Sequence, residues 1–307
     1  MIAPMVAAKH DLGVMAALGY PPEPIDPGNQ TFSLVNTPKV TSGYDAGSAW
    51  LTQFFYAQIV ERAVPASSLE AAEATKILEN TFRFINITFA QEFDEYCEKM
   101  GLNAREITTL AGTKPFGFMP FFAGPGIGGH CIAEDPYYLY ESMRLSGMEP
   151  KILEAAIANH ERRAAVIVER VVRRLGGRPI HGARILLLGV SYKPNIGDPR
   201  QSPAAPILRQ LESEGAVVDY HDSHVPRFAG RASVDLAAAA AEDYDLAVLI
   251  TEHADIDQAA LLKDGWRIVD TRNATRSHGA ERPQRRFAER IGEVVRLLKP
   301  RPVAGVR

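Results

Sequence analysis

The stretch ARILLLGV, residues 183–190, decides the fold of the C-terminal part of this chain. Its short, almost unbroken apolar run is typical of a strand that is buried on both faces of a sheet. Strand-like runs follow it between helix-like segments, and they are AVVDYHD at 216–222, DLAVLIT at 245–251 and WRIVDTRN at 266–273. Strands that alternate with helices at this spacing predict an α/β architecture with a Rossmann-like, doubly wound parallel sheet.

A long helix is predicted upstream of this sheet, in SSLEAAEATKILENTFRFINITFAQEFDEYCEKMG at 67–101. The segment opens with serine and Glu70, and it closes with Lys99 and Gly101, which are helix start and stop signals. Its apolar residues recur at steps of three and four, and Cys97 lies on that stripe as a buried, inert thiol. A rise of 1.5 Å per residue gives a length of roughly 45–50 Å. Such a length predicts a spine or a subunit interface, and a homodimer through the central helices is expected.

A second long helix is predicted at 149–177, where the pair Gly176–Gly177 is typical of a helix C-cap. A short helix at 103–112 and a glycine-rich loop lie between the two long helices. Residues 1–43 are rich in proline and glycine, and the stretch TPKVTSG at 37–43 fits the end of a strand. This N-terminal segment is interpreted as the edge of a further domain.

The composition is that of an ordinary globular protein of 307 residues, with 46% hydrophobic and 23% charged residues. The formal net charge of −3 gives no reason to expect nucleic acid or an anionic membrane as a partner. Two cysteines cannot build a disulfide framework or a structural zinc site. No apolar run approaches the ~20 residues that span a bilayer, so a cytoplasmic location is expected.

The glycine-rich loop GPGIGGHC, residues 124–131, fits the pattern G-x-G-x-x-G of dinucleotide-binding loops. That interpretation requires a strand directly before the loop and a βαβ unit around it. The preceding KPFGFMPFF at 114–122 contains two prolines and is a poor central strand. Pro125 also removes an amide that such a loop would direct at phosphate. The pattern alone therefore does not predict a cofactor site here.

A chemical role for Cys131 is the alternative. The flanking glycines allow a tight turn and a close approach to a substrate. The following IAEDPYYLYESMRL, residues 132–145, is predicted to be helical once Pro136 has fixed a first turn. A cysteine at a helix N-terminus has its thiolate favoured by the helix dipole, as a nucleophile requires. The competing interpretation is a small residue packed where nothing larger fits.

The segment TKPFGFMPFFAGPGIGGHCIAEDPYYL, residues 113–139, resembles the active-site segment of the UDP-glucose/GDP-mannose dehydrogenase family. Its GGHC form is most similar to the branch that acts on UDP-N-acetylglucosamine. Further stretches resemble motifs of the same family in the same order, and they are PPEPIDPGN at 21–29, EATKILENTF at 73–82, GVSYKPNIGDPRQSPA at 189–204 and VDTRNA at 269–274.

The resemblance implies a four-electron oxidation of a UDP-sugar that uses two NAD+ and supplies a polysaccharide precursor. The 6-hydroxyl of the sugar becomes an aldehyde, which Cys131 captures as a thiohemiacetal. A second hydride transfer gives a thioester, and water releases the carboxylate. The implied cofactor is NAD, and the implied partner is the UDP-sugar.

The resemblance also assigns roles to further residues. Lys76 and Asn80 would stabilise oxyanions, and their spacing of four places them on one helix face. Asp135 would assist proton transfer and position water, one turn beyond Cys131, and Glu23 would be a further acid/base or water-orienting group. The residues implied in substrate binding, with Arg200 in a supporting role, are Gly128, Gly129, Lys193, Arg200 and Arg272.

Family members begin with a Rossmann domain that binds NAD, and the resemblance starts only near the end of that domain. The expected organisation is a largely missing N-terminal Rossmann domain with its remnant at 1–43. A central helical dimerisation and active-site domain at 44–178 and a C-terminal UDP-sugar-binding α/β domain at 179–307 would follow. The alternatives are a truncated, catalytically inactive homologue that still binds UDP-sugar or dimerises, and an unrelated Rossmann-like binding protein.

Overall fold

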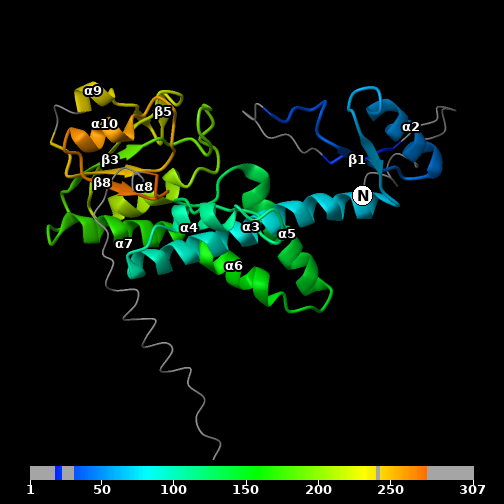
Figure 1. Ribbon diagram of the computed structural model, residues 1–307, viewed down its shortest axis with the longest axis horizontal. Coiled ribbons are helices and arrows are strands. Elements are labelled where there is room, and N and C mark those ends of the chain that lie inside the picture. The colour runs from blue at the N-terminus through cyan, green and yellow to red at the C-terminus, as the bar shows by residue number, and fades with distance from the viewer. Residues whose placement is uncertain (1–17, 23–30, 240–242, 275–307) are drawn as a thin grey trace, which may run out of the picture. The chain divides into compact units, whose positions relative to one another are not determined.

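The structure is a computed structural model that describes residues 18–22, 31–239 and 243–274 (Figure 1). It divides into two compact units. The first unit extends to Arg83 and includes Glu134–Glu149, and the second comprises Phe84–Ala133 and the residues from Pro150 onward. Each unit is described by itself below.

The first unit contains a small βαβ arrangement. Strand β1 (Lys39–Thr41) pairs in parallel with β2 (Ala63–Pro65), and helix α2 (Ala46–Tyr56) makes the crossover. Asp45 caps α2, because its side chain accepts a 2.7 Å hydrogen bond from the Ser48 amide. The predicted strand end at 37–43 is confirmed. The βαβ arrangement crosses residue 43, and the expected domain boundaries stay a prediction.

Helix α3 (Leu69–Met100) has 32 residues and confirms the predicted long helix. The hydroxyl of Ser68 accepts a 3.1 Å hydrogen bond from the Ala71 amide and caps the helix start. Cys97 is 1% exposed, as its place on the apolar stripe predicts. The short helix is also confirmed as α4 (Ala104–Ala111), which is capped by the Asn103 side chain.

Two helix predictions need correction. Helix α5 (His130–Leu145) begins within the glycine-rich motif 124–131. Pro136 therefore lies inside the helix and not in its first turn. The second long helix is two helices, α6 (Lys151–Glu161) and α7 (Arg163–Leu175). The regular α-helix is interrupted at Arg162, which keeps a right-handed conformation but has a ψ of −9° in place of the value of about −42° of an α-helix. The apolar spacing continues across this residue, which is why the sequence pattern resembles one helix. Gly176 ends α7 with a left-handed φ of 66°, as predicted.

The second unit contains the predicted parallel sheet, in the strand order β4-β3-β7-β8. Its strands are β3 (Arg184–Leu188), β4 (Val217–His221), β7 (Leu246–Leu249) and β8 (Ile268–Asp270). Its crossover helices are α8 (Ala204–Ser213), α9 (Leu236–Ala239) and α10 (Gln258–Lys263). A short antiparallel hairpin of β5 (Arg227–Phe228) and β6 (Arg231–Ala232) was not predicted. The prediction of a doubly wound sheet is confirmed.

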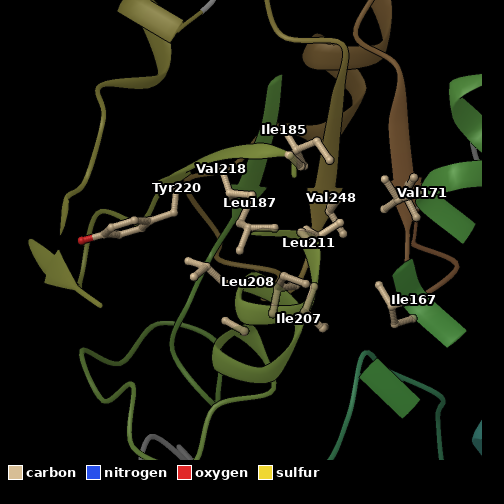
Figure 2. Packing of buried hydrophobic residues seen from close by; sticks show 14 of the residues in the cluster. Ile167, Val171, Ile185, Leu187, Ile207, Leu208, Leu211, Val218, Tyr220 and Val248 are labelled. Carbon is tan, nitrogen blue, oxygen red and sulfur yellow. The ribbon is translucent and has the colours of Figure 1, made fainter. Parts of the chain in front are cut away.

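Helices cover both faces of this sheet (Figure 1). On one face, Leu187 and Val248 pack with Ile207 and Leu211 of α8 and with Val171 of α7 (Figure 2). On the other face, a second cluster packs against α9 and α10. Strand residues alternate between the two clusters, so the sheet is buried on both sides. This arrangement leaves the ends of the strands as the place where ligands can approach.

Candidate active site

Cys131 is the second residue of α5, and its side chain is exposed. Gly129 precedes the helix with a φ of 86°, a backbone conformation that glycine adopts without strain. The first amides of a helix have no partner within it, and the helix dipole favours negative charge at this end. The position suits a nucleophilic thiolate, and the exposure argues against a residue kept only for its small size.

The glycines before Cys131 allow close packing against the segment 192–203. A Cβ atom at Gly126 would lie 2.7 Å from Cβ of Pro203. A Cβ atom at Gly128 would lie 2.8 Å from Cβ of Tyr192. Side chains at these positions would therefore push the two loops apart. The structure thus brings Gly128 beside the loop that carries Lys193 and Arg200.

The pyrophosphate of NAD does not fit the glycine loop at 124–131 or the turn after β3. No strand lies within 113–129, and the space beside Gly126 and Gly128 is filled by protein atoms. The turn after β3 is filled as well, because a Cβ atom at Gly189 would lie 2.5 Å from the carbonyl oxygen of Thr251. These observations support the interpretation of the loop at 124–131 as the support of Cys131 and not as a cofactor loop.

The Lys193 loop is held by its own backbone and side chains. The hydroxyl of Ser191 donates to the Lys193 carbonyl at 2.8 Å, and the Tyr192 amide donates to the Asp198 carbonyl at 2.9 Å. Arg200 forms a fork with Asp198, with Nε–Oδ1 at 2.9 Å and Nη2–Oδ2 at 2.6 Å. This hydrogen bonding lowers the pKa of Asp198. The fork joins Arg200 to Asp198 within the same loop, and the supporting role expected for Arg200 stays a prediction.

Arg272 follows β8 and lies against the beginning of the glycine loop. Its Nε donates to the Ile250 carbonyl at 2.7 Å, and its amide donates to Asp270 at 2.9 Å. A Cβ atom at Gly124 would lie 3.5 Å from Nη1 of Arg272. The glycine loop, the Lys193 loop and Arg272 thus belong to one region of the second unit.

The residues Asp222 and His253 form a buried network that the sequence analysis missed. Oδ2 of Asp222 accepts hydrogen bonds from the amides of Val190 at 2.7 Å and Ser191 at 3.1 Å, and it lies 3.0 Å from Nε2 of His253. Nδ1 of His253 accepts from the Asn195 amide at 3.0 Å. Burial raises the pKa of Asp222, but the hydrogen bonds from His253 and the amides outweigh it and lower the pKa to about 2. A sequence signal for this network exists, because Asp222 follows the end of β4 and His253 follows the end of β7.

His224, His253 and Asp255 place potential metal-ligand atoms within 4.8 Å of one another. Both ring nitrogens of His253 are already hydrogen-bonded within the described part of the chain. A metal ligand needs a nitrogen lone pair that no N–H donor occupies. The arrangement is therefore assigned to the network that holds the Lys193 loop.

In the first unit, Asn80 and Asp135 meet. Nδ2 of Asn80 donates to Oδ2 of Asp135 at 2.6 Å. Lys76 lies one turn before Asn80 on α3, and Asp135 lies one turn after Cys131 on α5. Glu23 lies outside the described residues. The structure thus joins two of the predicted catalytic residues, Asn80 and Asp135, by a hydrogen bond. Lys76 lies on the same helix as Asn80, and Cys131 lies on the same helix as Asp135.

The fold matches that of nucleotide-sugar dehydrogenases. The solved structure of UDP-D-ManNAc dehydrogenase from Pyrococcus horikoshii is 27% identical, with a TM-score of 0.74 over 84% of this chain and 61% of that chain. Residues 70–161 match the central domain of the UDP-glucose/GDP-mannose dehydrogenase family, and residues 186–277 match the UDP binding domain of that family. The chain belongs to the UDP-glucose/GDP-mannose dehydrogenase family.

Curated relatives are UDP-sugar dehydrogenases. The UDP-N-acetyl-D-glucosamine 6-dehydrogenase of Pseudomonas aeruginosa is 37% identical over 210 residues, which are 67% of this chain and 49% of the relative. The UDP-N-acetyl-D-mannosamine dehydrogenase of Methanocaldococcus jannaschii is 30% identical over 260 residues, 82% of this chain and 58% of the relative. The chain spans about half the length of the curated relatives it matches. No helix among the described residues is long and apolar enough to cross a membrane.

Proposed function

We propose that this chain carries the nucleophile and the nucleotide-sugar site of a UDP-sugar 6-dehydrogenase, acting on UDP-N-acetylglucosamine or a related UDP-sugar. The single observation that carries the proposal is the exposed Cys131 at the start of α5, with Asp135 one turn away and hydrogen-bonded to Asn80. The membership of the family supports the substrate class. The choice of sugar rests on the relatives alone.

The covalent step assigned to Cys131 is the capture of the sugar aldehyde. The thiolate sulfur adds to the C6 carbonyl carbon, the carbonyl electron pair moves to oxygen, and a proton on that oxygen completes a thiohemiacetal. No oxidant is needed for this addition. Cys131 is exposed at the helix start, so its sulfur is accessible to the aldehyde.

Asn80, Lys76 and Asp135 would serve the developing charge on the sugar oxygen. An amide nitrogen has two hydrogens, so Asn80 can bind Asp135 with one and donate the other to an alkoxide. The ammonium of Lys76 would add positive charge from the same face of α3. Asp135, held by Asn80, would pass a proton or orient water. The role proposed for Glu23 rests on the resemblance alone.

The diphosphate of the UDP-sugar is proposed to bind at the carboxyl ends of β3 and β7. These strands flank the point where the strand order of the sheet reverses, which is where doubly wound sheets bind ligands. Lys193 and Arg272 would supply positive charge there, and Gly128 and Gly129 would act by letting the glycine loop pack closely against Tyr192, beside Lys193. Arg200 would act indirectly, through its fork with Asp198.

NAD is proposed as the oxidant of the complete reaction because relatives of this chain are dehydrogenases. It would supply the acceptor for hydride. Since the glycine loop at 124–131 and the turn after β3 do not fit its pyrophosphate, no step of hydride transfer is assigned to these residues. The proposal is therefore limited to binding, aldehyde capture and proton handling.

The test measures alkylation of Cys131 by iodoacetamide, followed by peptide mass spectrometry. UDP-N-acetylglucosamine and its 6-aldehyde are compared at saturating concentrations. We expect the aldehyde to slow alkylation at least about tenfold more than the alcohol does, since only the aldehyde forms a bond to sulfur. Buried Cys97 is the internal control. Equal protection by both sugars would exclude covalent capture, and Asn80→Ala should reduce the difference.

A catalytically inactive, UDP-sugar-binding homologue is the second candidate. The close packing of the glycine loop at 124–131 and of the turn after β3, which leaves no room there for the pyrophosphate of NAD, favours it. It predicts that UDP-N-acetylglucosamine raises the melting temperature while no NADH forms when NAD+ is added. Formation of NADH by the wild-type chain would reject this candidate.

We also propose that the chain forms a homodimer through α3. Large apolar side chains of α3 are exposed at spacings of four and seven, which places them on one face of the helix, and they are Leu78, Phe82, Phe89 and Tyr96. Two copies related by a twofold axis would cover the same stripe on each other. Light scattering after gel filtration should give a dimer for the wild type and a monomer for Phe89→Glu. A wild-type monomer at high micromolar concentration contradicts this proposal.

A further inference from the structure

A buried carboxylate on α3 lies among donors from two other parts of the second unit. Asp94 is 2% exposed. Its Oδ2 accepts from Nη2 of Arg163 at 3.0 Å and from Nη2 of Arg170 at 2.8 Å, and its Oδ1 accepts from Nδ2 of Asn273 at 2.6 Å. Burial raises the pKa of Asp94, but the two arginines outweigh it and the net shift is downward. These four residues are called the Asp94 cluster.

One arm of the Asp94 cluster reaches the glycine loop. The side chain of Arg163 is 2% exposed, and its Nε donates to the Gly124 carbonyl at 2.9 Å. The guanidinium is a rigid plane, so its bond to Asp94 fixes the direction of its bond to Gly124. Gly124 begins the loop that ends at Cys131. The carboxylate thus determines where this loop leaves the helical core.

The other arm reaches Arg272. Asn273 is 5% exposed and has a φ of 54°, a left-handed conformation that asparagine tolerates better than most residues. Its amide is held by Asp94, so the conformation directly after Arg272 is held as well. Nη1 of Arg272 lies against Gly124, where the first arm ends. Both arms therefore meet at the contact between Gly124 and Arg272.

We propose that Asp94 is a positioning residue that sets the glycine loop of Cys131 and the Arg272 turn relative to each other. The roles of Cys131 and Arg272 in this statement rest on the proposed function, whereas the geometric coupling does not. A buried ion pair adds little net stability over a well-packed apolar replacement. The Asp94 carboxylate accepts three hydrogen bonds, one from Arg170 on α7 and two from the loop supports Arg163 and Asn273. The two bonds to the loop supports are explained by the geometry that they impose.

The chain offers a matched control for the Asp94 cluster. Glu98 lies one turn further along α3 and forms ion pairs with Arg170 and Arg173 of α7. It joins the same two helices, and neither pair involves Gly124 or Asn273. Glu98→Gln therefore weakens the helix pair without releasing either loop support.

The test compares Asp94→Asn, Arg163→Lys, Asn273→Gly and Glu98→Gln in the full chain, at a temperature where melting curves show each variant folded. Amide hydrogen exchange is measured in peptides covering 122–131 and 268–274. We expect exchange to accelerate at least about tenfold at 122–131 in Arg163→Lys, at 268–274 in Asn273→Gly, and at both in Asp94→Asn. Glycine keeps the left-handed φ, so Asn273→Gly removes the amide without adding strain.

The affinity for UDP, measured by calorimetry, gives the functional readout. Asp94→Asn and Asn273→Gly should weaken it about tenfold, and Glu98→Gln should leave it within about twofold. If wild type binds no UDP, the nucleotide part of the proposed function fails, and the exchange pattern still decides the coupling. Equal exchange in Asp94→Asn and Glu98→Gln overturns the proposal. If Asp94→Asn does not fold, the variants Arg163→Lys and Asn273→Gly decide. Acceleration only at 122–131 in Arg163→Lys and only at 268–274 in Asn273→Gly supports the proposal. Acceleration in both peptides or in neither overturns it.

Discussion

Among the described residues, the two parallel sheets differ in how they are covered. In the four-stranded sheet, Leu186, Leu187 and Leu188 are 0% exposed, and helices lie on both faces. In the pair of β1 and β2, the single helix α2 makes the crossover. That helix exposes Trp50 by 64% and Phe54 by 54%. Parallel strands are stable when both faces are covered, and two strands alone are marginal.

The difference indicates that the two units have different local stabilities. The residues proposed to bind nucleotide lie around the well-covered sheet, whose burial holds their loops in place. The residues proposed to be catalytic in the first unit, Lys76, Asn80 and Asp135, lie on helices that continue into the second unit. The following predictions test this comparison.

The largest expected effect is a cavity in the four-stranded sheet. Leu187→Ala removes a fully buried side chain between β3 and α8, and it should lower the free energy of unfolding by about 2–5 kcal/mol. The matched change in the first unit is Leu51→Ala, where the leucine is 46% exposed. It should change stability by less than about 0.5 kcal/mol. Urea titrations followed by circular dichroism give both values. Equal losses would contradict the comparison.

The next effect is a pH dependence from Asp222. Its carboxyl titrates at 3.8 when unfolded and at about 2 when folded. The folded carboxylate therefore adds about 2 kcal/mol of stability above pH ~4, and this is lost as the pH falls through about 2. Asp222→Asn should remove that dependence. The gap between wild type and variant, measured by urea unfolding, should narrow from pH 4 to pH 2. Asp219→Asn, on the strand β4 that ends directly before Asp222, is the control. A gap in stability that does not depend on pH would exclude Asp222 as the source of the pH dependence.

Local patterns in the sequence predict the sheet, the long helix and the position of Cys131, because periodicity, glycine and short apolar runs act over a few residues. The partners of buried polar groups are not predictable in this way. Asp94 and Asn273 bond across 179 positions of the chain, and neither has a local signal. The same holds for His253 and the Asn195 amide. The break at Arg162 was missed because the apolar spacing does not change there.

The two tryptophans allow the units to be followed separately. Trp50 reports on the first unit, and Trp266, which stacks with Tyr244, reports on the second. The variant Trp266→Phe leaves Trp50 as the probe of the first unit, and Trp50→Phe leaves Trp266 as the probe of the second. The fluorescence of Trp50 should change at a lower urea concentration than the fluorescence of Trp266. A separation of about 1 kcal/mol in the two free energies is expected if α3 couples the units incompletely. Coincident curves would show that the whole chain unfolds as one cooperative body.

The smallest effect concerns the exposed aromatic face of α2. Phe54→Gln with Phe55→Gln removes side chains that are 54% and 57% exposed. Glutamine also has the better helix propensity. Because little apolar area is lost from packing, the free energy of unfolding should change by less than about 0.5 kcal/mol. Trp50 fluorescence in urea measures this directly. A loss above about 1.5 kcal/mol would mean that these rings are covered in solution, and the contrast between the two sheets would then disappear.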